Sequence, residues 1–501
     1  MKNNNLISLL IVTILIFSFN FSDAQTPTFK LSDYKNPNYL YQTLDLNFGL
    51  NSGFINNNTS SNGVNPKYAV SSFTLNSGAG ANYSRYKNSL KTQQEQHVSL
   101  NAGIGSSSYQ NKSGNPEQQI KSNNFSHAED INISALSRFF NEKQQYFEAN
   151  GSIYGRYNGL SQGSKTTVSG TTLSETEGNQ KDLNLNLAGT LRVGKGRIEQ
   201  VQDARLAMYI LEDLQKLNRA KKVASNEDVL ALAQEITLLK YKRFFDNRLR
   251  KIAEITAIDA FLQKSSIAGV ADAAYFTSLN DNWDFANNPI RNSGKRFYAG
   301  LDANYGYNYE NNLVNYIVPV GEDAKYHYNK SFGGLFVVAG IDCEKPENLR
   351  WQKSSSIQLG VGVQSQVENE KALENTDETT YYLRALPSAK LSADYGFGYY
   401  PNSRTWLTFN WWLLSGWNKE MDGASKSEKE NLQNSFYTYT GPQFNAYYYL
   451  SEKLRLSLTF NGEFRFENKN YTYDVIAGNP EKATTTWWNQ QVNAALTYSL
   501  F

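Results

Sequence analysis

The sequence predicts an antiparallel transmembrane β-barrel of about 14 strands, with an α-helical periplasmic insert between the sixth and seventh strands. Two patterns predict it. Apolar and polar residues alternate with a period of two in repeated segments, and the connections between these segments alternate between long and short. The segment Lys453–Glu467 is the clearest example, because its Leu and Phe residues share one parity and its Arg, Ser, Thr and Asn residues the other. A hydrophobic content of 40% and a mean hydropathy of -0.56 exclude a helical membrane protein.

The first residues have the features of a secretory signal peptide. Lys2 precedes the apolar run Leu6–Phe17, and the small residues Ser22 and Ala24 lie where a signal peptidase requires them. The run is too short to cross a bilayer as a helix. We therefore expect residues 1–24 to be cleaved and residues 25–39 to form a periplasmic lead. An uncleaved anchor is the alternative.

Residues 40–194 are expected to form strands 1–6 of the barrel. In each strand, apolar or aromatic residues recur on one parity for about ten residues, the length that a tilted strand needs to cross the hydrocarbon core. The sixth strand places Leu183, Leu187 and Val193 on the apolar parity and Asn184 and Arg192 on the polar parity. The six expected strands are residues 41–51, 68–86, 97–105, 130–139, 147–157 and 183–193.

The period changes after the sixth strand, where residues 195–270 are expected to form a helical insert. Apolar residues recur at helical spacing over residues 203–218. The run from Ser225 to Asp228 is a capping start for a second helix, which continues to Leu262 with a break. Three interpretations of the insert are open: a hairpin packed on itself or on the barrel mouth, a plug or docking module for a periplasmic protein or the cell wall, and an oligomerisation element.

Residues 271–501 are expected to form strands 7–14. Long connections such as 158–180 follow odd-numbered strands, and short ones such as 141–143 follow even-numbered strands. Outer-membrane barrels have long extracellular loops and short periplasmic turns, so this pattern places the insert in the periplasm. Cys343, the only cysteine of the sequence, is expected in a turn. The eight expected strands are residues 296–309, 332–341, 355–367, 388–399, 405–414, 436–450, 453–467 and 487–501.

The polar parity of the strands carries charges of both signs, and these side chains are expected to face the lumen. Opposed charges inside a barrel either form ion pairs that close it or line a constriction that filters solutes, and both interpretations are open. The candidate lumen charges are Asp45, Arg138, Glu148, Arg156, Arg192, Asp302, Lys390, Asp394, Arg455, Glu463 and Arg465.

The sequence gives little reason to expect catalysis, a cofactor or a metal site. His97 and Ser99 share one face of a strand, and His127 lies near Glu129 and Asp130, which makes an outer-membrane hydrolase a distant alternative. Phosphate-binding loops and zinc-binding spacings are absent from the sequence. A net charge of +2 gives no electrostatic reason to expect nucleic acid as a partner.

The signal peptide, the tyrosine-rich alternating strands and the terminal Phe501 resemble those of a bacterial outer-membrane β-barrel, in the style of the Bacteroidota. The resemblance implies contact with outer-membrane lipid and insertion by the barrel-assembly machinery, with Tyr498 and Phe501 as the candidate assembly signal. Phe501 departs from the family pattern, because its parity is opposite to that of the lipid-facing Leu496 and Tyr498.

The architecture favours a passive or gated channel for small polar solutes, or a component of export. The alternative is a non-conducting outer-membrane scaffold whose helical insert docks a periplasmic partner or the cell wall. Ion conductance separates these two hypotheses, because only the first requires an open path through the lumen.

Overall fold

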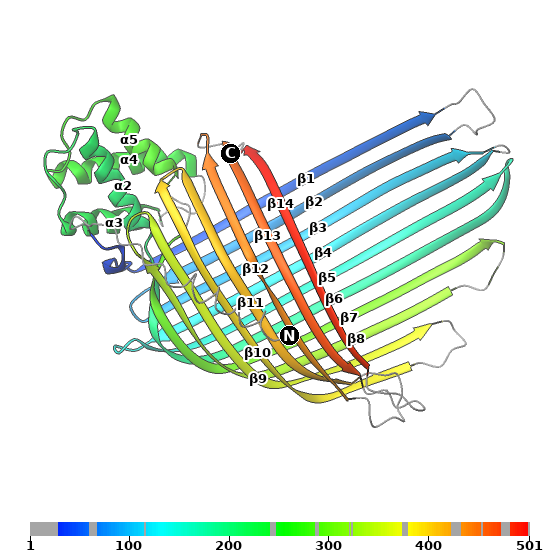
Figure 1. Cartoon of the computed structure of the whole chain (residues 1–501). Helices are drawn as coiled ribbons and strands as arrows, with labels where there is room; N and C mark the ends of the chain where they lie inside the picture. Colours follow the sequence, from blue (N-terminus) through cyan, green and yellow to red (C-terminus); the bar gives the residue numbers. More distant parts are fainter. Residues whose placement is uncertain are drawn as a thin grey trace, which may run out of the picture.

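The computed structural model describes residues 29–59, 68–114, 117–240, 247–285, 290–319, 321, 324–372, 379–421, 432–451, 454–471 and 481–498. Within them, 14 antiparallel strands form one sheet in chain order, and helices α2 to α5 lie between β6 and β7 (Figure 1). The predicted fold class, a β-barrel with a helical insert, is confirmed. The expected signal peptide and Phe501 lie outside the described residues.

The strands are longer than the sequence suggested, and each contains most of the segment that the alternation predicted. The first half of the sheet comprises β1 (Tyr39–Thr59), β2 (Tyr68–Asn88), β3 (Thr92–Ser113), β4 (Gln118–Phe140), β5 (Gln145–Val168), β6 (Thr171–Gln200) and β7 (Asn292–Val318). The second half comprises β8 (Ala324–Pro346), β9 (Trp351–Ala372), β10 (Thr379–Asn402), β11 (Thr405–Met421), β12 (Leu432–Tyr449), β13 (Leu454–Tyr471) and β14 (Glu481–Tyr498).

The apolar parity of the strands faces outward. Leu191 and Val193 on β6 are 53% and 61% exposed, whereas the side chain of Arg192 between them is only 17% exposed. The largest apolar core among the described residues lies instead in the helical insert and its contacts. A sheet that exposes its Leu, Ile, Val and Phe residues and turns its charges inward has the polarity of a barrel that sits in lipid.

Several of the expected long loops are strand in the structure. β3 and β4 extend through most of residues 108–124, and β5 and β6 extend through residues 158–180 until only Ser169 and Gly170 join them. These segments are rich in Ser, Thr, Asn and Gln on both parities, so they show no apolar alternation, yet their backbones still pair. We call the end of the barrel that these segments form the rim end.

The opposite end carries the short connections, and we call it the turn end. β4 and β5 are joined there by Asn141–Gln144, and β10 and β11 by residues 403–404. The predicted alternation of long and short connections therefore holds only in part, because the two-residue connection between β5 and β6 at the rim end is as short as the one between β10 and β11. Cys343 is not in a turn: it lies within β8, opposite Lys295 on β7, because β8 continues to Pro346.

The helical insert is a small domain at the turn end. Its helices are α2 (Gln202–Lys216), α3 (Asn226–Lys240), α4 (Asn247–Lys264) and α5 (Ala273–Phe285). The expected start of α3 is confirmed, because Ser225 and Asp228 exchange side-chain and backbone hydrogen bonds of 2.9 and 3.2 Å. α5 begins after residue 270, beyond the segment in which helix was expected. No helix among the described residues is long and apolar enough to cross a membrane.

The N-terminal segment is part of this domain. Its short 3-10 helix, η1 (Leu31–Asp33), leads to Tyr34, whose ring is fully buried among the helices. The Tyr34 hydroxyl lies 2.5 Å from Thr237 Oγ1 on α3, and burial raises the pKa of this phenol. Thr237 in turn donates to Asp203 on α2, which also forms a buried ion pair of 2.9 Å with Lys240. The lead residues before β1 are therefore anchored to the insert.

The two edge strands, β1 and β14, are the ends of the sheet. No ladder joins them among the described residues, and in Figure 1 the two strands run at a steep angle to each other. Unpaired backbone groups in hydrocarbon cost several kcal/mol each, so we expect β1 and β14 to pair once the protein is in a bilayer.

Hydrogen exchange in lipid nanodiscs tests this closure. We expect the amides of residues 40–55 and 484–496 to exchange as slowly as those of interior strands such as β5. Fast exchange confined to β1 and β14 would show that the barrel keeps an open seam in the membrane.

Candidate functional site

A chain of charged side chains crosses the inner wall from β4 to β7. Glu148 on β5 is 2% exposed and lies between two guanidinium groups, with Arg138 Nε at 2.5 Å and Arg192 Nη1 at 3.6 Å. Arg192 also donates from Nη2 to Asp302 Oδ1 on β7 at 3.0 Å. We call these four residues the lumen ladder. It brings together four of the predicted lumen charges through direct ion pairs.

The ladder continues to β9 through a residue that the sequence reading missed. Gln358 donates to Asp302 Oδ2 at 3.2 Å and accepts from the Tyr298 hydroxyl at 2.9 Å. Between β7 and β9, β8 carries Gly340, and the Tyr298 ring lies over it where a Cβ atom would collide with that ring. A glycine is therefore required for the tyrosine to reach across β8. The sequence does not indicate this contact, because Gln358 is one of many inward-facing polar residues and Gly340 is an ordinary glycine within a strand.

A polar cavity of about 610 Å³ lies at the turn end of the lumen. Strands from the first and the second half of the sheet line it, which are the two walls of the barrel at this point. Glu95 and Arg138 come from β3 and β4, and Asp394 comes from β10. Arg296 on β7 forms an ion pair of 2.6 Å with Asp342 on β8 inside it. The full lining is Tyr86, Gln93, Glu95, Arg138, Ile198, Gln200, Ile290, Asn292, Arg296, Asp342, Glu344, Ser354, Ser355, Ser356, Asp394 and Asn410.

The charge in this cavity is predominantly negative. Four carboxyl groups line it, from Glu95, Asp342, Glu344 and Asp394, against two guanidinium groups, from Arg138 and Arg296. Burial raises the pKa of Glu344 to about 7, so the excess of negative charge lies between one and two at neutral pH. Because fixed charge in a narrow aqueous path attracts counter-ions, this stretch of the lumen favours cations over anions.

The other predicted lumen charges do not join the ladder. Asp394 accepts a long hydrogen bond of 3.4 Å from Asn410, and Arg156 donates to Asn158 at 3.0 Å. Glu463 and Arg465 pair with each other on β13 at 2.5 Å. Three residues have other surroundings: Lys390 Nζ lies 4.0 Å from the centre of the Phe336 ring, Arg455 lies over Tyr447 and Tyr449, and Asp45 lies opposite Asn82 on β2.

The remaining candidates from the sequence lie apart from this network. His97 Nδ1 is 3.1 Å from the Ser84 hydroxyl rather than bonded to Ser99. His127 Nδ1 lies 3.0 Å from Glu129 Oε1. Tyr498 is the last residue of β14 and is paired with Leu454.

Among the described residues, several contacts attach the helical domain to the turn end of the barrel. Tyr209 on α2 donates to the Tyr400 carbonyl oxygen at 3.0 Å, and Asp281 on α5 accepts from Arg404 at 2.8 Å. Arg291, which directly precedes β7 and is 1% exposed, donates to the carbonyl oxygens of Leu349 at 2.6 Å, Trp351 at 2.8 Å and Asn348 at 2.9 Å. These contacts hold the domain against the β8–β9 and β10–β11 turns, next to the polar cavity.

Within the domain, a salt bridge links the end of α2 to the start of α5. Arg219 donates to Asp272 through Nε at 3.0 Å and through Nη2 at 2.6 Å. These side-chain hydrogen bonds from Arg219, together with the Tyr275 backbone N–H, lower the pKa of Asp272 to about 2.

This salt bridge predicts a pH dependence of the domain. Since the pKa of Asp272 is lower in the folded protein than the ordinary value of about 3.9, its stabilisation is present above pH 4 and is lost as the pH falls towards 2. We expect the difference in helix melting temperature between the wild type and Asp272→Asn to shrink over that range, measured by circular dichroism. Glu212→Gln, which removes only an exposed pair with Lys216, is the control. A constant difference down to pH 2 would contradict the assignment.

No protein-family model matches the chain, and no curated protein is similar to it in sequence. Among solved structures, the translocator domain of the autotransporter NalP from Neisseria meningitidis is similar at 11% sequence identity and a TM-score of 0.24, over 84% of this chain and 91% of that one. At this score, the fold assignment rests on the strand ladders of the chain itself.

Proposed function

We propose that the protein is an outer-membrane channel for small polar solutes, with a preference for cationic ones, and that its helical domain covers the periplasmic mouth. The observation that carries the proposal is the polar cavity at the turn end, which both walls of the barrel line and in which carboxyl groups outnumber guanidinium groups. The turn end is the periplasmic end in this proposal, because outer-membrane barrels keep their short connections there. The proposal assigns no catalytic step to the protein.

The place of the helical domain supports a gated rather than a permanently open path. Its contacts through Tyr209 and Asp281 reach the turn end, and Arg291, between the domain and β7, is bonded to the β8–β9 turn, so the domain lies where a solute would enter or leave the lumen. The Asp281–Arg404 ion pair is exposed and can break at a cost of about 1 kcal/mol. The buried Tyr209 hydrogen bond and the packing of Leu349 in the apolar core of the domain hold more firmly. Movement of the domain would then open the mouth while the barrel stays intact.

A second candidate is a scaffold that binds a periplasmic partner through the same domain. It is favoured by the exposed apolar residues Val223, Ile252 and Val270, which lie on the domain and not on the lipid-facing wall. In that case the lumen need not conduct.

Permeation of small polar solutes into liposomes that contain the purified protein tests the proposal. We expect slow entry of small cationic solutes such as lysine, slower entry of anionic solutes of the same size, and no entry of large oligosaccharides. Equal impermeability to all of them, also after removal of the helical domain, would favour the scaffold.

A further inference from the structure

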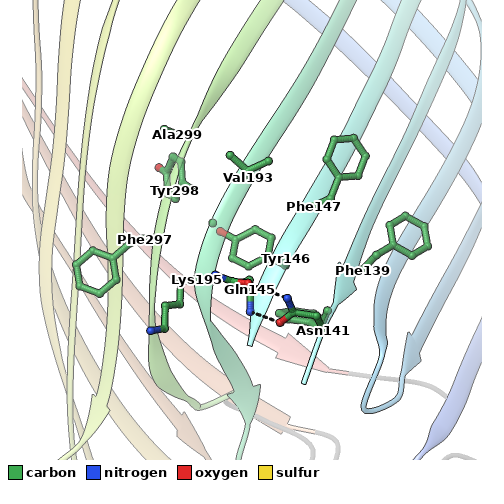
Figure 2. A pocket seen from close by; sticks show the side chains of 12 residues that line it. Phe139, Asn141, Gln145, Tyr146, Phe147, Val193, Lys195, Phe297, Tyr298 and Ala299 are labelled. Carbon is green, nitrogen blue, oxygen red and sulfur yellow. Dashed lines mark hydrogen bonds between the residues drawn. The ribbon is translucent and has the colours of Figure 1, made fainter. Parts of the chain in front are cut away.

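An apolar groove runs along the outer wall at the turn end of β4 to β7. Phe139 and Phe147 form one side of it and Phe297 the other, with Val193 between them (Figure 2). These four residues have the parity opposite to that of the lumen ladder, and Phe297 is 54% exposed, so their side chains face lipid. The groove is also lined by Phe140, Tyr146 and Tyr298, which have the parity of the ladder and are buried. Its volume is about 740 Å³.

The end of the groove nearest the turns is polar. Figure 2 shows Asn141, Gln145 and Lys195 there, with a hydrogen bond of 2.8 Å from Asn141 to Gln145. Lys195 is exposed and lies directly opposite Gln145 on β5 and Phe297 on β7. The groove is thus amphipathic along its length, with aromatic rings towards the membrane centre and an amine at the edge.

A second amine lies next to the first. Lys295 is exposed and lies two residues before Phe297 on β7, which makes it the diagonal neighbour of Lys195 at about 7–8 Å. Neither amine forms an ion pair with a carboxylate among the described residues. Lys345 and Lys353, on β8 and β9, differ in this respect, because both pair with Glu347, at 2.9 and 3.2 Å.

We propose that this groove binds one anionic glycerophospholipid, with an acyl chain between the Phe139, Phe147 and Phe297 rings and the phosphate at Lys195 and Lys295. An anionic headgroup fits because two unpaired cations lie on neighbouring strands at the polar end, and Lys side chains near a membrane surface attract anionic lipid. Aromatic residues at this depth anchor a barrel at the level of the headgroups. The inference requires the barrel to sit in a bilayer but does not depend on whether its lumen conducts.

Native mass spectrometry of the full-length protein in detergent, titrated with phosphatidylglycerol or phosphatidylcholine, tests the site. We expect phosphatidylglycerol to bind more tightly, and the double variant Lys195→Gln/Lys295→Gln to weaken its binding by roughly tenfold or more. The same variant should leave phosphatidylcholine binding unchanged. Phe297→Ala should weaken both lipids, because it removes one side of the groove.

The double variant Lys345→Gln/Lys353→Gln is the matched control, since it removes the same charge from neighbouring strands outside the groove. Heat-modifiable migration on gels shows that each variant still contains a folded barrel. Equal binding of the two lipids, or equal losses in the two double variants, would overturn the proposal in favour of unspecific contact with the apolar belt.

Discussion

Replacing Glu148 with alanine is expected to lower the free energy of unfolding by about 3–5 kcal/mol. The carboxylate is almost fully buried and is the only member of the lumen ladder that contacts both Arg138 and Arg192. Its removal leaves two guanidinium groups close together in a poorly solvated wall, with Asp302 as the one remaining carboxylate of the ladder. The cost comes from these uncompensated charges more than from the lost ion pairs themselves.

Reversible urea unfolding of the protein in lipid vesicles, followed by tryptophan fluorescence, measures this effect. Glu175→Ala is the matched control, because Glu175 pairs with Lys165 at the rim end between side chains that are 31% and 43% exposed. We expect the control to cost less than about 1 kcal/mol. Equal effects of the two substitutions would mean that water enters the wall around Glu148 and that the ladder does not close the barrel.

The membrane-crossing part of the fold is predictable because it depends on local alternation. Leu183 to Val193 needs no distant partner to indicate an outward and an inward face, and strand β6 has those faces. The strands at the rim end cannot be predicted in this way. Residues such as Ser161, Asn179 and Thr176 are polar on both parities, so only the pairing of β5 with β6 reveals that they are strand.

The candidate site likewise has a part that local alternation predicts and a part that depends on strand pairing. The inward position of Arg138, Glu148, Arg192 and Asp302 follows from parity, but which charges meet depends on the register between strands. Gly340 and Gln358 acquire a role only because Tyr298 spans β8. Likewise, nothing local to Tyr34 indicates that it inserts between helices about 200 residues further along the chain.

Removal of the helical domain is expected to increase the ionic current through the barrel several-fold. The structure allows a clean excision, because Gln200 pairs with Asn292 and the Val201 N–H donates to the Arg291 carbonyl oxygen at 2.7 Å. β6 and β7 are therefore already adjacent where the insert begins and ends. An Asn-Gly pair in place of residues 201–291 supplies the two-residue turn that closes an antiparallel hairpin.

Two controls accompany this variant. Heat-modifiable migration reports whether the excised chain still folds as a barrel. Glu95→Gln/Asp394→Gln in the excised barrel removes two of the four cavity carboxylates, so the preference for cations should fall while the conductance persists. A change in conductance without a change in selectivity would place the ion path away from the polar cavity.

Single-channel conductance of the intact and excised proteins in planar bilayers, under a potassium chloride gradient, shows whether the lumen conducts and whether the helical domain covers its mouth. We expect small or intermittent cation-selective currents from the intact protein and steady, several-fold larger ones after excision. Silence from a folded, excised barrel would contradict the proposed function, because it would show that the lumen is closed by its own side chains and that the helical domain covers no channel.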